Sequence, residues 1–411
     1  MERVVITGIG TINPLANNSI DTWKRALSNT VSCDNISRFD AGNLQTQIAC
    51  EIKAYDPLSF LDKKDINRLD RVSQYALIAA NEAIEMSSLS QKENKERIGV
   101  IWATGNGGAE TYDQTLKDIF VDNRRVSPYF IPKILLDTSS GIISIKHGLK
   151  GVNYTTVAAC ASGSTAIADA FNYIRWGKAE AIVTGGSDAP ICESIVRGFN
   201  ALKALSTNNE NPRQAIRPFD IGRNGFVLGE GGAALVLESY TSAKERGAKI
   251  IAEVVGTGIN ADAYHMTAGH PEGQGAAACI KLALDEAGIS FKDLDYVNAH
   301  ATSTKVGDMA EANALASFGK LESAPMVGAT KSMTGHLMGA AGAIEGIFCA
   351  LAVQNNVLPP NVNLDQLDIE IPQQINFIGS NKIEMNVNYA LSNNFGFGGH
   401  NSSVLFKKYI E

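Results

Sequence analysis

Short apolar segments that run into glycine recur along the chain and constrain its fold more than any other feature. Residues 3–10 and 98–108 each lead from apolar residues into glycines, with a helical pattern between them. From residue 250 a similar order begins again, with a strand pattern at 250–260 followed by a helical one. Alternating strands and helices indicate stacked α/β layers. The recurrence predicts two related halves, residues 1–249 and 250–411.

Hydrophobic periodicity assigns the remaining segments. We expect helices over residues 60–86, 273–288 and 341–353, the last with Ala343, Ile347, Ala350 and Leu351 on one face. The segment 225–239 is interpreted as two strands that meet at a tight bend, and residues 109–150 show less regular patterning.

Composition and charge exclude several classes of function. A net charge of −7 over 411 residues argues against general nucleic-acid binding. No apolar run is long enough to span a membrane, and the start lacks a cationic leader, so we expect a cytoplasmic protein without membrane association. Six scattered cysteines without CxxC spacing fit a reducing compartment and speak against structural zinc. Gly8 and Gly10 match only part of a dinucleotide-binding motif.

The stretch TTVAACASGSTAIADAFNYI (155–174) places a lone cysteine between a strand and a helix. Cys160 lies among alanines, serine and glycine, which are too small to block a substrate. Unpaired N–H groups at a helix start favour a thiolate, so a nucleophile is one interpretation. A buried structural cysteine is the other, and this stretch alone does not decide between them.

Two of the six histidines stand out by their settings. His300 ends a predicted strand in NAHATST, and His336 lies between glycines in TKSMTGHLMGAAG. Because the carboxyl ends of strands in open α/β sheets meet at a common crevice, we expect both near Cys160. A thiol with two imidazoles permits covalent acyl chemistry. The thiol carries the acyl group, and the N–H groups of the two histidines hold the oxygen of an enolate formed from a second substrate. A metal site is the competing interpretation, but ligands at metal-binding spacing are missing and none is expected.

Further residues complete this hypothesis. The N–H groups of Cys160 and of the glycine loop 396–399 are candidates for an oxyanion hole. Lys331, Asp308 and Glu311 lie near the two histidines in sequence and could form a charge-balanced network. Alternatively, Asp308 and Glu311 simply face solvent on a helix, and the sequence favours neither interpretation.

Taken together, the motifs resemble those of the elongating type II β-ketoacyl-acyl-carrier-protein synthases, condensing enzymes of the thiolase superfamily. The resemblance covers nearly the whole chain, through AACASGS (158–164), RPFD (217–220), GFVLGEG (225–231), AHATST (299–304), TKSMTGHLMGAAGA (330–343) and NFGFGGHNS (394–402). It implies a five-layered α-β-α-β-α fold of two duplicated halves, usually a homodimer. It also implies decarboxylative condensation of malonyl-acyl carrier protein with an acyl chain, in fatty-acid or related polyketide or polyene biosynthesis.

The resemblance assigns roles to individual residues. It implies that Cys160 is acylated, that His300 and His336 serve decarboxylation and condensation, and that Lys331 and Glu311 support them. The other implied positions are the gate and oxyanion donor Phe397, the phosphopantetheine-binding Thr302 and Thr304, and the acyl-pocket residues Asn106 and Phe199. No cofactor is implied, because the substrates arrive on the phosphopantetheine of acyl carrier protein.

An acidic carrier protein requires a basic docking surface, because surface charges set encounter rate and partner choice. The residues that fall where the family places such charges are Lys64, Arg68, Arg124, Arg125 and Lys203. Asn67 stands where the bacterial fatty-acid enzyme usually has a basic residue, which predicts weaker or differently specific docking.

Two departures bear on the substrate and the gate. Asn106 stands where the fatty-acid enzymes carry an aliphatic residue, and a buried amide beside an alkyl chain is unfavourable unless it is hydrogen-bonded. We therefore hypothesise a shorter, more polar or unsaturated acyl group. His400 replaces the usual threonine and adds a titratable group near the gate.

Three alternative functions are compatible with parts of the sequence. Cys160 and both histidines argue against a non-catalytic chain-length partner, although the active half of a heterodimer with such a partner stays open. A thiolase needs a second cysteine in the C-terminal glycine loop, and GFGGHNSS has none. Primer-loading synthases carry asparagine where this chain has His336.

Overall fold

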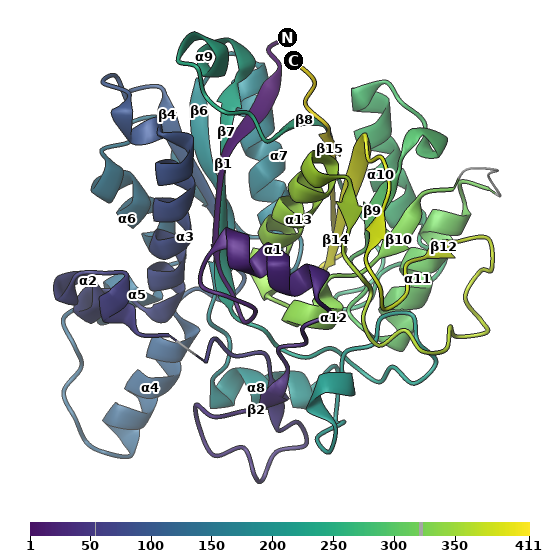
Figure 1. Ribbon diagram of the computed structural model, residues 1–411. Helices are drawn as coiled ribbons and strands as arrows, with labels where there is room; N and C mark the ends of the chain where they lie inside the picture. The colour runs from purple at the N-terminus through teal and green to yellow at the C-terminus, as the bar shows by residue number, and fades with distance from the viewer. Residues whose placement is uncertain (54, 320–323) are drawn as a thin grey trace.

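The helices and strands stack in five layers (Figure 1). The computed structural model describes residues 1–53, 55–319 and 324–411. Helices α3 and α6 cover the outer face of the N-terminal strands, α10 and α11 cover the C-terminal strands, and α7 and α13 lie between. The five-layered, duplicated fold predicted from the sequence is therefore confirmed.

The thirteen α-helices in the described part of the chain have the following bounds: α1 Ser19–Leu27, α2 Lys63–Arg68, α3 Arg71–Ser87, α4 Ala109–Phe120, α5 Phe130–Ile134, α6 Thr138–His147, α7 Ser162–Arg175, α8 Glu193–Ala201, α9 Tyr240–Glu245, α10 Gln274–Ala287, α11 Lys305–Ala316, α12 Lys331–Thr334 and α13 Ala341–Asn355. Its strands are β1 Val4–Ile12, β2 Asp34–Asn35, β3 Ile48–Ala49, β4 Ile98–Ala103, β5 Asn153–Thr156, β6 Ala181–Asp188, β7 Gly231–Ser239, β8 Ala252–Ala261, β9 Tyr296–Asn298, β10 Met326–Gly328, β11 Val357–Leu358, β12 Asn376–Phe377, β13 Ile383–Glu384, β14 Tyr389–Gly396 and β15 His400–Lys407.

The strand pairing repeats between the two halves. In the first half β1 pairs with β7 and β7 with β6 antiparallel, while β6, β4 and β5 run parallel. In the second half β8 pairs with β15 and β15 with β14 antiparallel, while β14, β9 and β10 run parallel. β1 and β8 join the halves antiparallel. The domain boundary at residue 249/250 stays a prediction, although it falls just before β8.

The glycines of β1 and β8 serve helix packing, which the sequence alone did not reveal. A Cβ on Gly8 or Gly10 would lie 2.1 or 2.2 Å from carbonyl oxygens of α3. A Cβ on Gly256 or Gly258 would lie 2.2 or 2.0 Å from carbonyl oxygens of α10. The glycines of the partial dinucleotide motif thus allow a helix to pack closely on β1, as Gly256 and Gly258 do on β8 in the second half.

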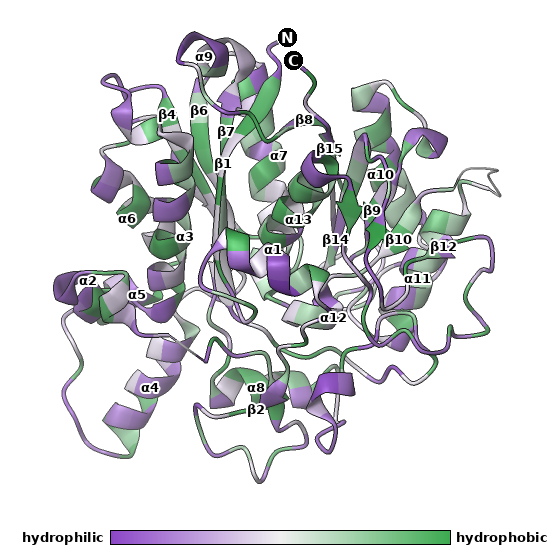
Figure 2. Ribbon diagram, in the orientation of Figure 1, coloured by the Kyte–Doolittle hydropathy of each residue, from purple (hydrophilic) through white to green (hydrophobic). Residues whose placement is uncertain are grey.

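Apolar segments concentrate in the central layers, and the polar ones lie outside (Figure 2). The predicted helix with its apolar face is present as α13, and every residue from Ala341 to Val353 is buried, so burial extends around the whole helix. A helix that is apolar all round belongs inside a core. No helix in the described part of the chain has both the length and the apolarity to cross a bilayer.

Two further predictions differ from the structure. Residues 109–150, which lacked a clear pattern, contain α4, α5 and α6. The expected two strands at 225–239 are one strand, β7, preceded by a segment that forms isolated bridges through Phe226, Leu228 and Gly229. The bridge of Leu228 pairs it with His336, so this segment builds the site rather than the sheet.

Substituting a packing glycine tests this account of the repeat. We expect Gly258→Ala to lower the free energy of unfolding by at least about 2 kcal/mol, because its Cβ would overlap the Cys279 carbonyl oxygen at 2.0 Å. Gly198→Ala is the matched control, since nothing lies within 4 Å of its Cβ inside α8 and alanine favours a helix. Urea unfolding measures both variants, and equal stability would contradict the close packing of α10 on β8.

Candidate active site

Cys160, His300 and His336 converge on one cavity of about 720 Å³. Their elements come from both halves: Cys160 lies in the turn between β5 and α7, His300 follows β9, and His336 follows α12. The cysteine sulfur and a ring nitrogen of each histidine lie within 4.8 Å of one another. The predicted trio is therefore assembled, although His336 follows a short helix rather than a strand.

The turn that carries Cys160 is held in a sparsely populated backbone conformation. Ala159 has φ +49°, a left-handed value that costs a non-glycine residue roughly 1–2 kcal/mol. The Ser162 hydroxyl donates to the Ala159 carbonyl at 2.6 Å and accepts from the Ala158 N–H at 2.8 Å. These bonds fix the turn, and Cys160 lines the cavity.

The small residues after Cys160 are needed for packing between the halves. A Cβ on Gly163 would lie 2.8 Å from the Ala343 nitrogen of α13. Ser164 hydrogen-bonds to Asn394 of β14, and a Cβ on Gly342 would meet Ser164 at 2.3 Å. Their size allows α7 and α13 to approach closely, in addition to leaving room beside the sulfur.

The environment of the Cys160 thiol differs from the one expected at a helix start. Burial raises its pKa to about 11, whereas the Lys331 charge and backbone N–H bonds from Phe397 and Cys160 itself lower that pKa. The expectation of a favoured thiolate was wrong, because α7 begins only at Ser162 and loss of solvent outweighs the nearby positive charge. The two N–H groups at the sulfur are the pair expected to bind an oxyanion.

Both imidazoles are neutral at physiological pH. Burial lowers the pKa of His300 and of His336 well below the usual value, and the Lys331 charge lowers both further. The rings lie edge to face with centroids 5.5 Å apart. Nδ1 of His300 and both ring nitrogens of His336 are buried and have no partner among the described residues. Neutral rings with unpaired nitrogens can donate to an oxygen placed between them.

Hydrogen bonds from separate segments position the two histidines. The N–H groups of His300 and Ala301 donate to Glu311 at 2.9 and 2.7 Å. The His336 N–H donates to the Val227 carbonyl at 2.9 Å, and its carbonyl accepts from Gly229 at 2.9 Å. These hydrogen bonds hold the loops that carry His300 and His336, and so fix the orientation of both rings.

The two carboxylates near His300 are buried, so their interpretation as a solvated helix face was wrong. Burial raises the pKa of Asp308 to about 6 and that of Glu311 to about 7. Asp308 accepts from the N–H groups of Ser303 at 3.0 Å and Phe219 at 2.9 Å, and lies 3.6 Å from Arg223. Both carboxylates therefore hold loop backbone, and neither has a direct ion pair with Lys331.

The partner of Lys331 is Glu345, which sequence reasoning missed. Lys331 Nζ lies 2.5 Å from Glu345 Oε1, and both side chains are 1% exposed. Asn394 donates to the other carboxylate oxygen at 2.7 Å. The signal was present in the sequence, because Glu345 is the one charged residue in the apolar stretch 341–353. A lone carboxylate in a buried helix requires a partner.

Asp188 at the end of β6 was also missed. It accepts from Gly105 N at 2.8 Å, Asn106 N at 3.0 Å, Thr104 Oγ1 at 3.0 Å and Gly339 N at 2.6 Å. It therefore ties the loop after β4 to the loop that follows His336. An acidic residue at the carboxyl end of a strand was the available signal.

The predicted pocket residues line the same cavity. Thr302 and Thr304 lie with hydroxyl oxygens 3.2 Å apart, and Phe199 lies with its ring centroid 6.4 Å from that of Phe397. Asn106 lies beside Gly105 in the wall. The structure thus brings the predicted residues to one cavity, while their individual roles stay predictions.

The predicted docking residues are all exposed and lie at three places. Lys64 and Arg68 lie on α2, where the Arg68 guanidinium lies 5.5 Å from the ring centre of Tyr129. Arg124 and Arg125 follow α4, and Arg124 lies 3.4 Å from Asp118. Lys203 lies at the rim of the cavity that holds Cys160.

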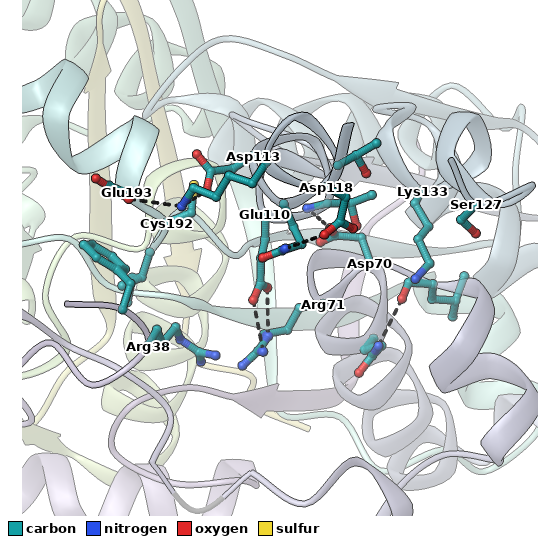
Figure 3. Close-up of a pocket in the computed structure, with 18 of the residues that line it drawn as sticks. Arg38, Asp70, Arg71, Glu110, Asp113, Asp118, Ser127, Lys133, Cys192 and Glu193 are labelled. Atoms are coloured by element: carbon teal, nitrogen blue, oxygen red, sulfur yellow. Dashed lines mark hydrogen bonds and ion pairs between the residues drawn. The ribbon is translucent and has the colours of Figure 1, made fainter. Parts of the chain in front are cut away.

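A second cavity, of about 580 Å³, lies between α3 and α4 and is lined by charged side chains (Figure 3). Arg71 lies 2.9 Å from Glu110, and Lys117 lies 3.1 Å from Glu193. Cys192 lines this cavity, but no histidine does. Because the charges pair with one another, we assign the chemistry to the cavity that holds Cys160.

The geometry also allows Cys160, His300 and His336 to be considered as metal ligands, since their donor atoms are close. The Lys331 charge, which lowers the pKa of all three groups, opposes a second cation at the same place. The trio therefore fits a reaction that develops negative charge better than it fits a bound cation.

Comparisons with known proteins agree with this site. The family model "Beta-ketoacyl synthase, N-terminal domain" matches residues 1–243, and "Beta-ketoacyl synthase, C-terminal domain" matches residues 251–365. The chain is 44% identical over 411 residues to a 3-oxoacyl-[acyl-carrier-protein] synthase 2 of Staphylococcus aureus, covering 99% of each chain.

Two solved structures share the fold. A β-ketoacyl synthase from Burkholderia phymatum has a TM-score of 0.92 and 33% identity, with 100% of each chain covered. A type II polyketide ketosynthase in complex with its acyl-carrier protein and bound to the hexaketide has a TM-score of 0.90 and 28% identity, covering 99% of this chain and 100% of that one.

The pH dependence of alkylation tests the environment of Cys160. Because its pKa is raised to about 11, we expect the rate of modification by iodoacetamide to rise about tenfold per pH unit from pH 7 to 9. Lys331→Met should slow the reaction at every pH, because it removes a charge that favours the thiolate. Mass spectrometry of the Cys160 peptide measures the rate, with Lys305→Met as the matched control on the exposed rim. A plateau between pH 7 and 8 would contradict a buried, neutral thiol.

Proposed function

The chain belongs to the β-ketoacyl synthase family, and on that premise we propose that it joins malonyl and acyl groups carried by acyl carrier protein. The observation that carries the proposal is a thiol and two neutral imidazoles in one cavity, with two N–H groups at the sulfur. Cys160 is the nucleophile, and His300 and His336 hold the charge that develops on the malonyl thioester.

Acyl transfer comes first. The Cys160 sulfur attacks the carbonyl carbon of the acyl thioester, and the bond between that carbon and the pantetheine sulfur breaks. The thiol proton leaves with the pantetheine sulfur. Donation from the N–H groups of Cys160 and Phe397 stabilises the tetrahedral oxyanion. Since the resting thiol is neutral, its proton must move as the carbon–sulfur bond forms.

Condensation follows. The bond between the malonyl carboxylate and the α-carbon breaks, CO₂ leaves, and its electron pair forms an enolate. The N–H groups of His300 and His336 hold the enolate oxygen, and burial keeps both rings neutral. The α-carbon then attacks the acyl carbonyl on Cys160, and the cysteine sulfur leaves and takes up a proton. The product is a β-ketoacyl thioester two carbons longer.

Lys331 and the buried carboxylates support this chemistry without touching the substrate. Burial keeps both histidines deprotonated, the Lys331 charge lowers their pKa values further, and Glu345 balances that charge inside the core. Glu311 and Asp308 hold the backbone around His300. We assign them positioning roles.

The substrates reach Cys160 on a flexible arm. We infer that the hydroxyls of Thr302 and Thr304 bind the phosphopantetheine in the cavity entrance, with Phe397 as gate and Phe199 and Asn106 in the acyl pocket. We infer that the acidic carrier docks on the exposed basic residues, which are Lys64, Arg68, Arg124, Arg125 and Lys203. All six cysteines are free, which supports the cytoplasm as the compartment.

A homodimer is the assembly we propose. The edge strand β5 leaves one side of its backbone unpaired, and Val157 beyond it is 51% exposed. The neighbouring helices α4 to α6 and their connections expose further apolar side chains, namely Tyr112, Leu116, Phe120, Val121, Val126, Ile131, Leu135, Leu136 and Ile145. A patch of this extent marks an interaction surface. The heterodimeric alternative is not favoured, because identity to the synthase 2 relative is 44% against 28% to the polyketide ketosynthase.

Product analysis tests the reaction. We expect wild-type protein with an acyl-carrier-protein primer to gain the acyl mass on Cys160, and malonyl carrier protein to yield the β-ketoacyl product. Cys160→Ala should abolish acylation but retain malonyl decarboxylation, whereas His300→Ala and His336→Ala should acylate yet lose at least about 10²-fold in condensation. His265→Ala, on an exposed loop, is the control. Condensation that persists in either histidine variant would contradict the assigned roles.

The oligomeric state tests the proposed interface. Wild-type protein should sediment as a dimer at micromolar concentration, and Ile145→Asp with Leu135→Asp should shift it to monomer, because charges are costly in an apolar interface. Leu58→Asp, at a residue that is 66% exposed on another element, is the control. A monomeric wild type would refute the homodimer.

A further inference from the structure

Asp188 is a buried carboxylate near Cys160 that takes no direct part in acyl transfer or condensation. It ends β6 and is fully buried. The N–H groups of Gly105, Asn106 and Gly339 donate to its two oxygens. The Thr104 hydroxyl is its fourth donor. These donors are neutral, and they come from two loops that lie far apart in the sequence.

Four donors that converge on one side chain require a group that only accepts. An ionised carboxylate meets this requirement, whereas an asparagine amide of the same shape would place an NH₂ group against one of the donors. Burial raises the pKa of Asp188 to about 6, and the bonds from the three N–H groups and the hydroxyl lower that pKa. The carboxylate is therefore ionised at physiological pH, the state that can accept all four hydrogen bonds.

The two loops meet at Asp188 without free space between them. A Cβ on Gly339 would lie 2.7 Å from Asp188 Oδ2 and 2.6 Å from the Thr104 carbonyl carbon. On the other side, a Cβ on Gly186 of β6 would lie 2.7 Å from the Gly339 carbonyl oxygen. Because close-packed interiors transmit displacement, a shift of the loop after β4 must move Gly339 as well.

The two loops carry different parts of the active-site cavity. Gly105 and Asn106 line its wall. Gly339 follows His336 by three residues, and Met338 between them lines the cavity with a left-handed φ of +52°. One carboxylate thus holds both the wall and the segment that leads away from His336.

Asp188 also acts on the thiol through its charge. Burial is the main cause of the raised pKa of Cys160, Asp188 adds to it, and Lys331 opposes it. A nearby anion disfavours the thiolate, so removal of the Asp188 charge must favour it.

We propose that Asp188 is a positioning residue for two half-reactions, acyl transfer to the cysteine and decarboxylation of the malonyl thioester. Its carboxylate holds the wall at Gly105 and Asn106, against which the acyl group lies. Through Gly339 it also holds the segment that places His336 for the enolate. The inference rests on the proposed condensing function. Both half-reactions therefore depend on one side chain that touches neither substrate.

Asp188→Asn tests this role. The variant keeps the shape of the side chain but turns one acceptor into a donor that faces another donor. We expect acyl transfer from an acyl-carrier-protein thioester to Cys160 to slow at least about tenfold, the range for lost hydrogen bonds to a charged group. CO₂ release from malonyl carrier protein, measured with Cys160→Ala as the parent protein, should fall by a similar factor.

Alkylation of Cys160 separates this role from a general loss of structure. Because Asp188→Asn removes a negative charge, iodoacetamide should modify Cys160 faster than in wild type from pH 7 to 9, although acyl transfer is slower. The fully buried Cys279 and Cys349 should react as in wild type, which mass spectrometry of their peptides measures. Faster alkylation of these two cysteines as well, or no acceleration at Cys160, would overturn the proposal.

Glu82→Gln is the matched control. Glu82 also accepts two backbone N–H groups and a hydroxyl, from Thr11 and Ser19, and it does not line the active-site cavity. Because the site is distant, both half-reactions and the alkylation of Cys160 should stay within about twofold of wild type.

Thr104→Val provides a second test if Asp188→Asn does not fold. It removes one of the four donors and leaves the charge of Asp188 in place. Acyl transfer should slow at least about threefold, the effect of one lost hydrogen bond. An unchanged rate would overturn the proposal.

The outcomes also separate this inference from the proposed function. If Asp188→Asn retains the wild-type rate of either half-reaction, the role of Asp188 is overturned and the condensing reaction stands. If wild-type protein shows no acyl transfer, no decarboxylation and no β-ketoacyl product, the condensing function itself is overturned.

Discussion

The close contact of α7 with α13 is the constraint on which the rest of the structure depends. These helices form the central layer, and glycine at positions 163 and 342 lets their backbones approach until a methyl group would not fit. Cys160 precedes α7, and His336 precedes α13. The same contact therefore joins the two halves of the fold and sets the distance between Cys160 and His336.

Burial then determines the charge state of Cys160, His300 and His336. It keeps the thiol and both imidazoles neutral, and the buried Lys331 nearby is held in an ion pair with Glu345. A neutral site with oriented N–H donors stabilises negative charge only when the reaction produces it. That property suits an enolate and a tetrahedral oxyanion, and it does not suit a permanent metal cation beside Lys331.

The sequence was sufficient for the layers, the repeat and the convergence of Cys160, His300 and His336 on one cavity, because strand patterns and the settings of these three residues are local signals. It was insufficient where the answer depends on distance in space. Glu345 lies fourteen positions after Lys331, and nothing local indicates that they pair. The thiolate expectation failed for the same reason, because a helix start is visible in sequence and the degree of burial is not. The helices within residues 109–150 were not predicted. One reason is that α4 buries none of its residues, so its sequence lacks a clear apolar face directed at the core.

The central claim is that His300 and His336 are both neutral while they lie beside a neutral thiol. NMR of protein labelled with ¹³C at histidine Cε1, with each signal assigned by a His→Gln variant, measures this directly. The account predicts that both signals keep the neutral chemical shift from pH 8 down through the ordinary histidine pKa of about 6.5. Lys331→Met should move their titration upward. A protonated imidazole at either position at pH 7 would contradict the account, because a charged ring beside Cys160 would form an ion pair with a thiolate instead.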